Sequence, residues 1–289
     1  MSRRQTRQTR LALETAGSLL RTTVAVGACA IVLVPLLFMA GASFMPAIDI
    51  MRMPYLWIPE TWKPANYLRA LAGNDGQWMY LRNILNSVIV SSSIAVTTVV
   101  LSSLVGYGLA KFRFRGRNAV FMAIMGTMMI PFETVMIPLY LIIVKLGMQN
   151  SYAGLIVPFL MNAFGVFIMR QYLITFPGEM LDAARIDGCS EPRIFWDIVF
   201  RNAGPAAATL AVLSFRQQWD NLLWPLLVAQ EEKMKTIPAY IVKFAAEKHA
   251  DEGAMMAVAV IASLPVFMLF FTLSKYFLGG SAVYQAGKE

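Results

Sequence analysis

The sequence predicts an all-α integral membrane protein with six transmembrane helices and a polar helical hairpin between the fourth and the fifth. Of its 289 residues, 57% are hydrophobic and only 15% are charged, a composition too apolar for a soluble domain. Six apolar runs reach the roughly 20 residues that a helix needs to cross a hydrocarbon core about 30 Å thick. Charged residues instead concentrate in the stretch "MLDAARIDGCSEPRIFWDIVF" at 180–200, which predicts the hairpin.

The six predicted spans are each bounded by charges or by stretches that contain proline or glycine. They cover residues 22–43, 84–109, 119–143, 152–172, 205–228 and 254–277. Pro131, Pro138 and Pro158 fall inside these runs, and we expect them to bend or locally open their helices, because neighbouring groups in a bundle can satisfy the freed carbonyls.

The second predicted span carries small residues at helical spacing. They are Ser87, Ser91, Thr98, Ser102 and Gly106. In lipid, where water does not drive apolar packing, a face of small residues lets a neighbouring helix approach closely. We therefore expect this face to be a structural contact.

The distribution of basic residues predicts the orientation, because lysine and arginine favour the cytoplasmic side. The N-terminal tail (1–21) holds five arginines and the segment 111–117, "KFRFRGR", holds four basic residues. Alternating spans place both on one side, together with the hairpin and the C-terminal tail (278–289). The opposite loops, 44–83 and 229–253, mix basic with acidic residues. Both termini and the hairpin are thus predicted to be cytoplasmic.

The first apolar run has an alternative interpretation as a cleavable signal peptide, since an arginine-rich start precedes it and "AGA" follows at 40–42. The run exceeds the ~7–15 apolar residues of a usual signal core, and cleavage would leave five spans. We expect an uncleaved membrane anchor.

Few residues in the chain could form a metal site or a disulfide. Cys29 lies in the first span and Cys189 in the hairpin, a separation in depth that argues against a bond between them. His249 is the one histidine, so a metal centre is not expected.

The hairpin reads as two short helices. Pro177 suits the start of a helix over 178–187, and Gly188 can adopt the left-handed conformation that ends it. Ser190 is the expected cap of a second helix. That helix has one apolar stripe, formed by Ile194, Phe195, Ile198 and Val199. Helices this short need a surface to pack on, and the residues alone leave open whether it belongs to this chain or to another protein.

The segment "DAARIDGCSEPRIFWDIVFRNAGP" resembles the cytoplasmic EAA loop of the membrane subunits of ABC importers. Further blocks resemble the carbohydrate-uptake, maltose-permease-like branch of that family, in the same order and spacing from about residue 55 to 280. Examples are "NILNSVIV" at 83–90, "GYGLAKFRFRGR" at 106–117, "MMIPFETVMIPLY" at 128–140 and "QWDNLLWPL" at 218–226.

The resemblance implies the type I ABC importer permease fold and a subunit with no chemistry of its own. In this family the loop sits in a cleft of a separate subunit that binds ATP and Mg and hydrolyses the ATP. Asp182 stands where the family has Glu, and Arg201 where it commonly has Pro. The residues that the resemblance assigns to coupling with the ATPase are Asp182, Ala183, Ala184, Asp187, Gly188, Ile194, Phe195 and Ile198.

The same resemblance implies a location in the bacterial inner membrane and a set of partners. These are membrane lipid, a second membrane permease subunit, two ATP-binding subunits, an extracytoplasmic solute-binding protein and a saccharide, with no nucleic acid. A homodimer and a heterodimer of membrane subunits both stay open, as do the identity and charge of the saccharide. No cofactor is expected on this chain.

Three charged residues, Glu133, Arg216 and Asp220, fall inside or beside apolar runs. A lone charge in lipid costs several kcal/mol, so each should face protein or water. Arg216 and Asp220 are four residues apart and can pair on one helix face. Alternatively, this region lines an aqueous path for the cargo. The candidate path residues are Glu133, Arg216, Gln217, Trp219, Asp220 and Asn221.

A secondary transporter, or a channel subunit without an ATPase partner, is the alternative function. Such a transporter predicts internal repeats and membrane-embedded ion sites, and the sequence has no convincing repeat. A membrane enzyme predicts a cluster of His, Asp or Cys near one face, which is absent from the sequence. The terminal "AGKE" lacks the first glycine and the Ser/Thr of a phosphate-binding loop. ATP hydrolysis is therefore expected in another chain.

Overall fold

The computed structural model describes residues 3–73, 76, 78–246 and 251–286. Within these ranges the regular secondary structure is helical throughout and contains no strand, which confirms the all-α prediction. His249 and the last three residues of the predicted C-terminal tail lie outside the described residues. Cys29 and Cys189 are both free thiols.

The chain divides into two compact units, Met1–Ala70 with Lys248–Ile261, and Leu71–Glu247 with Ala262–Glu289. The first unit contains two whole helices, most of a third and the start of a fourth. They are α1 (Arg3–Ala42), α2 (Ala47–Ile50), α3 (Ala65–Ala72) and the beginning of α14 (Glu252–Ala286).

In the first unit, the segment after α1 is held against the start of α14 by buried polar groups. The amide of Asn66 donates to the carbonyls of Ser43 and Met45 at 3.0 and 2.8 Å. Asp251, whose side chain is only 7% exposed, pairs with Lys63 at 3.0 Å and with Arg69 at 2.9 Å. Burial alone would raise the pKa of Asp251, but hydrogen bonds from Lys63 and a backbone N–H and the two positive charges lower it below its ordinary value.

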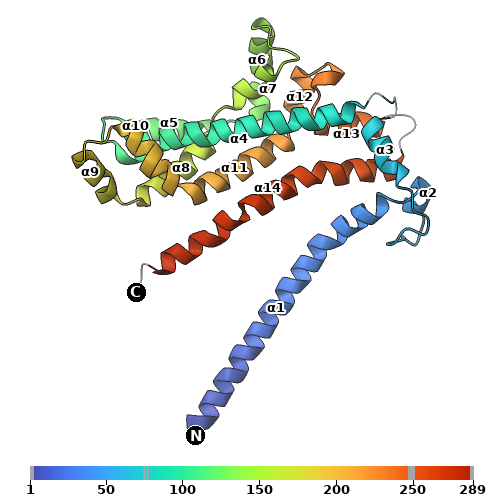
Figure 1. Cartoon of the computed structure of the whole chain (residues 1–289), viewed down its shortest axis with the longest axis horizontal. Coiled ribbons are helices and arrows are strands. Elements are labelled where there is room, and N and C mark those ends of the chain that lie inside the picture. Colours follow the sequence, from blue (N-terminus) through green and yellow to red (C-terminus); the bar gives the residue numbers. More distant parts are fainter. Residues whose placement is uncertain (1–2, 74–75, 77, 247–250, 287–289) are drawn as a thin grey trace. The chain divides into compact units, whose positions relative to one another are not determined.

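The second unit is built on α4 (Met79–Lys111), with α8 (Ala163–Thr175) and α11 (Gly204–Trp219) packed beside it (Figure 1). The predicted small-residue face of α4 is buried along its whole length. A Cβ atom placed on Gly106 would lie 2.9 Å from Met169 Cβ, and one on Gly165 would lie 2.5 Å from Ser102 Oγ. The prediction of a close helix contact is therefore confirmed.

Three helices are unbroken and apolar enough to cross a membrane, and three further pairs of helices qualify as bent spans, giving up to six. The unbroken stretches are Gly17–Ala42, Met79–Lys111 and Glu252–Ser274. The bent pairs join α5 (Arg117–Thr127) to α6 (Phe132–Lys145) at 92°, Tyr152–Phe159 to α8 at 45°, and Glu191–Phe200 to α11 at 81°.

Two of the three prolines that were expected to bend their helices lie at these bends. Pro131 immediately precedes α6, and Pro158 lies in the short 3₁₀ turn η1 (Val157–Phe159) that follows α7 (Tyr152–Ile156). Pro138 lies inside α6 without ending it. The predicted span 205–228 is also interrupted, because α11 ends at Trp219 and α12 (Leu223–Val228) begins after a gap.

Trp224 anchors the bent region of the second unit. Its ring is 1% exposed, its indole N–H donates to the carbonyl of Gly154 at 3.1 Å, and it packs edge-to-face on Phe132 and Phe159. This aromatic cluster joins α6, α7 and α12. After α12 this unit continues with η3 (Glu232–Met234) and α13 (Ile237–Ala246), and the part of α14 from Ala262 onward completes it.

Candidate functional site

The polar hairpin consists of α9 (Gly178–Ile186), the single turn α10 (Glu191–Arg193) and η2 (Ile194–Phe200). Gly188 has φ +78°, and Cys189 N–H donates to Ala184 O at 2.9 Å, so the first helix ends in the predicted left-handed turn. Ser190 precedes α10 as predicted, but its side chain makes no cap hydrogen bond. The second helix winds as a π-helix over Ile194–Phe200, a rare conformation often found at functional sites.

The inner face of the hairpin packs on its own chain. Ile194 is 0% and Phe195 2% exposed, and they form one cluster with Leu181, Tyr107 and Leu173. Ala184 and Val199 are also buried there, and Ile198 is half-buried. The apolar stripe predicted on the second helix is thus used for attachment to α4 and α8. Leu181, Ile194 and Phe195 are therefore covered by the chain itself, whereas Ile198 is covered only in part.

An ion-pair network ties the two hairpin helices to each other and to α4. The guanidinium of Arg185 pairs with Glu191 at 2.7 Å and with Asp182 at 2.8 Å. Glu191 also accepts a hydrogen bond from the hydroxyl of Tyr107 at 2.8 Å. The bond from Arg185 lowers the pKa of Glu191, burial partly opposes this, and the Tyr107 bond adds to the lowering. The same contacts raise the pKa of Arg185, so both groups are charged at neutral pH.

The sequence alone does not mark Arg185, Glu191 and Tyr107 as a connected group. The one available signal was the presence of opposite charges on either side of the Gly188 turn. Tyr107 lies 84 positions away from Glu191, and nothing in the sequence joins the two.

The outer face of the hairpin is exposed. It is formed by Asp182, Ala183, Ile186, Asp187 and Gly188. Ile186 is 86% exposed, and Met180 and Trp196 nearby are each 45% exposed. Four of the eight predicted coupling residues therefore lie on this face, namely Asp182, Ala183, Asp187 and Gly188. Ile186 was not predicted, although it is the most exposed large apolar side chain of the hairpin.

A cavity of about 790 Å³ opens where three chain breaks meet. Its walls come from the α5–α6 bend, the turn before α8 and the gap between α11 and α12. Among its polar lining residues are Glu133, Asn162, Gln217, Gln218, Asp220 and Asn221, and its aromatic ones are Phe132, Phe159 and Phe164. Four of the six predicted path residues thus share one cavity. The helix breaks explain why polar side chains gather there, because irregular backbone in a membrane is tolerated where it lines a cavity.

Arg216 and Trp219 do not line this cavity. Arg216 Nε lies 3.8 Å from Asp220 Oδ2, the pairing predicted from their spacing, with both side chains about 60% exposed. Trp219 is 4% exposed, stacks on Phe215 and donates its indole N–H to the carbonyl of Ala262 at 3.1 Å. Trp219 therefore holds α11 against the neighbouring backbone of α14.

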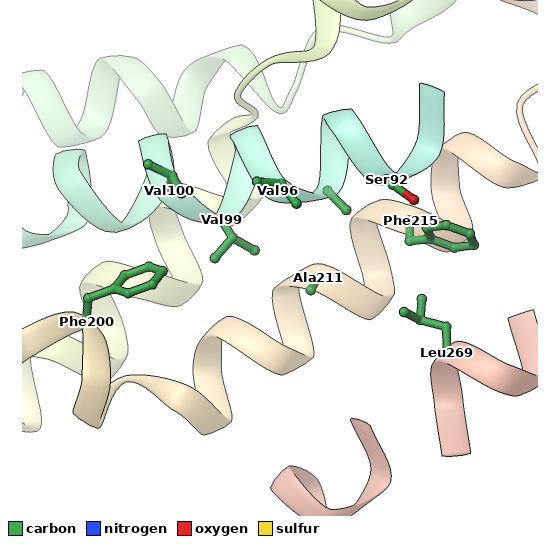
Figure 2. A pocket seen from close by; sticks show the side chains of 9 residues that line it. Ser92, Val96, Val99, Val100, Phe200, Ala211, Phe215 and Leu269 are labelled. Atoms are coloured by element: carbon green, nitrogen blue, oxygen red, sulfur yellow. The ribbon is translucent and has the colours of Figure 1, made fainter. Parts of the chain in front are cut away.

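A second pocket of about 330 Å³ lies between α4, η2, α11 and α14 (Figure 2). Ser92 supplies the only polar side chain among its lining residues, and the rest are Ala, Val, Leu and Phe. A hydroxyl-rich ligand would lose its hydrogen bonds to water there without replacement. The cavity at the chain breaks is therefore the better candidate for a polar cargo.

Known proteins similar to this chain agree on one family. The family described as the binding-protein-dependent transport system inner membrane component matches residues 98–279, more than half of the chain. The arabinooligosaccharides transport system permease protein AraQ of Halalkalibacterium halodurans is 35% identical over 251 residues, covering 86% of this chain and 89% of that protein. The sn-glycerol-3-phosphate transport system permease protein UgpE of Rhizobium meliloti is 33% identical over 255 residues, covering 86% and 90%.

A solved structure shares the fold. It is the crystal structure of a bacterial ABC transporter involved in the import of the acidic polysaccharide alginate, and it aligns with a TM-score of 0.79 at 22% identity over 91% of this chain and 97% of the matched one. The helices, the polar hairpin and these matches lead to one assignment. The chain belongs to the binding-protein-dependent transport system inner membrane components, the non-catalytic, multi-pass permease subunits of ABC importers.

Proposed function

We propose that this permease subunit serves an ATP-driven importer of a sugar or oligosaccharide and that its hairpin transmits the motion of a separate ATPase. The observation that supports this most directly is that the hairpin has two distinct faces. One is attached to α4 and α8, and the other, around Ile186, is exposed. An element of this kind can transmit a displacement from a partner to the helices that line the cavity.

The coupling contacts belong to the outer face. Asp182, Ala183, Asp187 and Gly188 contact the ATPase together with Ile186, while Ala184, Ile194, Phe195 and Ile198 hold the hairpin in place. ATP and Mg bind the partner, and its conformational change shifts the permease only through contacts that differ between the two states. Asp182 is joined to Arg185 at 2.8 Å. Asp182, which stands where the family has Glu, therefore contributes to coupling through this ion pair with Arg185.

The cargo path includes the cavity at the chain breaks. Amide and carboxylate groups of Glu133, Gln217, Asp220 and Asn221 bind sugar hydroxyls, and the aromatic rings of the lining offer apolar faces to sugar rings. The two relatives are named for arabinooligosaccharides and sn-glycerol-3-phosphate, and the matched structure for alginate, which are all hydroxyl-rich compounds. A second permease subunit completes the path.

The assembly consists of this chain, a second membrane subunit, two ATP-binding subunits and an extracytoplasmic solute-binding protein. Both termini and the hairpin face the cytoplasm. The loops 44–83 and 229–253 face outward and contact the solute-binding protein.

The coupling proposal is tested by uptake and ATPase assays. We expect the purified chain alone to hydrolyse no ATP, and the complex with its ATPase to do so. Ala183→Glu adds a charge to an exposed face, and Gly188→Pro cannot adopt φ +78°. Both should abolish uptake and leave membrane insertion intact. In a separate ATPase-binding assay the two hairpin variants should lose the bound ATPase, and Ile58→Glu, at a site 75% exposed in the predicted outer loop, should keep it. Because that loop is assigned to the solute-binding protein, Ile58→Glu is a control for ATPase binding and not for uptake. Unchanged uptake in both hairpin variants would contradict the proposal.

The path proposal is tested by Gln217→Leu and Asp220→Asn, which change the cavity lining without a large change of volume. We expect saccharide uptake to fall while the ATPase still co-purifies with the complex. Ser92→Ala in the apolar pocket is the control and should transport normally. An equal loss of saccharide uptake in all three variants would show that the cavity does not bind the cargo.

A further inference from the structure

The short loop between α4 and α5 is strongly basic. Residues 111–117, "KFRFRGR", include Lys111, Arg113, Arg115 and Arg117, and no acidic residue occurs in the sequence between Asp75 and Glu133. Within the described part of the chain, none of the three arginines forms an ion pair with a carboxylate. The positive charge of this basic loop is thus not neutralised by the permease itself.

The basic loop has a defined shape. Arg117 donates from its guanidinium to the carbonyl of Phe112 at 3.3 Å, and Gly116 turns the chain with φ +84°. Beside this turn lies a hollow of about 350 Å³, lined by Arg113, Phe114, Gly116, Arg117, Asn118 and Ala119. The size suits a phosphate-bearing headgroup, and two guanidinium groups at its edge can bind phosphate oxygens in a bidentate manner.

Two large apolar side chains flank these arginines. Phe112 is 39% and Phe114 48% exposed, and Arg113 and Arg115 each follow one of them in the sequence. Phe112 packs partly on Tyr107, with ring centroids 5.4 Å apart, but its exposed part and the ring of Phe114 would gain nothing from contact with water alone. At a membrane surface, the rings can enter the acyl boundary while the arginines remain at the level of the headgroups.

The position of the loop in the fold agrees with a membrane surface. It follows directly on the unbroken apolar span Met79–Lys111 and precedes α5, none of whose eleven residues is buried. Lys111 donates to the carbonyl of Phe176, which places the loop at the same end of the bundle as the hairpin. The loop therefore lies where an apolar span reaches the headgroup layer.

We propose that the basic loop is a binding site for the headgroup phosphate of an anionic phospholipid, with Arg113 and Arg117 at the hollow as the phosphate ligands, Arg115 as a further exposed positive charge, and Phe112 and Phe114 beside the acyl chains. The alternation of arginine with exposed phenylalanine favours a lipid over a free anion, which would make no use of the rings. The continuity of the loop with the exposed helix α5 favours lipid over a protein partner. The assignment of this lipid to the inner leaflet follows from the proposed orientation, but its binding by the purified chain does not depend on it.

The test is a native mass spectrometry titration of the full chain in detergent with phosphatidylglycerol and, separately, with phosphatidylcholine. The variant R113Q/R115Q changes two exposed residues and retains the hydrogen bond of Arg117 that closes the turn. We expect its preference for phosphatidylglycerol to fall about fivefold for each arginine, and roughly 25-fold in all. The control R3Q/R4Q removes the same charge from the N-terminal tail and should keep the preference.

Phe112→Ser with Phe114→Ser is a second variant that leaves the charge unchanged, and it should weaken retention of both lipids. An unchanged phosphatidylglycerol preference in R113Q/R115Q would overturn the proposal. Equal losses in R113Q/R115Q and R3Q/R4Q would also overturn it, because they would indicate general charge attraction. The proposal would also be overturned if R113Q/R115Q kept its lipid but no longer co-purified with the ATPase, because that result would assign the loop to a protein contact. None of these measurements uses ATP or cargo, so they stand apart from the test of coupling.

Discussion

Ile186 and Ile194 belong to the same hairpin but should respond to mutation in opposite ways. Ile186 is 86% exposed on the outer face, whereas Ile194 is 0% exposed against α4 and α8. Truncation of each to alanine removes the same atoms. The comparison therefore separates a side chain that binds a partner from one that holds the hairpin in place.

The expected magnitudes follow from burial. Ile194→Ala leaves a cavity in a closed cluster and should lower the free energy of unfolding by about 2–5 kcal/mol. Ile186→Ala removes atoms that already contact solvent, so unfolding should change by no more than about 0.5 kcal/mol. If the ATPase buries Ile186, truncation should weaken the complex by about 1.5–3 kcal/mol, which corresponds to roughly a 10- to 150-fold loss of affinity.

Two measurements on the same preparations distinguish these outcomes. Thermal unfolding of the detergent-solubilised chain reports stability, and binding of the purified ATPase to immobilised permease reports affinity. We expect Ile186→Ala to weaken only the binding of the ATPase and Ile194→Ala to lower the unfolding temperature. Unaltered ATPase binding by Ile186→Ala would refute the assignment of the outer face as the docking surface.

Three further predictions concern the contacts that position these sites. Tyr107→Phe removes the 2.8 Å hydrogen bond to Glu191 and should cost about 1 kcal/mol, measured as faster proteolysis of the hairpin. Gly165→Ala should destabilise the chain by about 1–3 kcal/mol, because its Cβ would lie 2.5 Å from a side-chain oxygen. Gly108→Ala is the control, because a Cβ atom at Gly108 would have no neighbour within 4 Å outside its own helix, and it should not lower the unfolding temperature. Because the fold lowers the pKa of Asp251, its ionised carboxylate stabilises the folded chain fully above the ordinary pKa of 3.8. This stabilisation is lost as the pH falls through the lowered pKa of the folded chain. Asp251→Asn should therefore make the unfolding temperature less sensitive to acid.

The fold class and the helical runs could be predicted because lipid imposes a length and a composition on each span. The small-residue face of α4 was also predictable, since close packing in lipid selects such residues. The bends were predictable only in part. Pro131 lies at a 92° bend, whereas Pro138 is accommodated within α6, and the gap after Trp219 has no proline. Whether a helix continues there depends on neighbours that are distant in sequence.

The hairpin shows the same limit for function. Its turn at Gly188 follows from local backbone preference, so it was visible in the sequence. Which of its apolar residues face inward was not, because Ile186 and Ile194 look alike until the hairpin is packed on α4. The sequence also does not show where Trp219 points. Its aromatic ring is of a type that binds sugars, but it is buried and donates a hydrogen bond to a backbone carbonyl.

Site-directed cross-linking tests the coupling role of the hairpin most directly. In a background with Cys29→Ser and Cys189→Ser, single cysteines at positions 186 and 194 are treated with a short bifunctional reagent in the assembled complex. We predict a cross-link from position 186 to the ATPase whose yield changes on addition of ATP, and none from position 194. Absence of a cross-link from position 186, in a complex that still transports, would contradict the account.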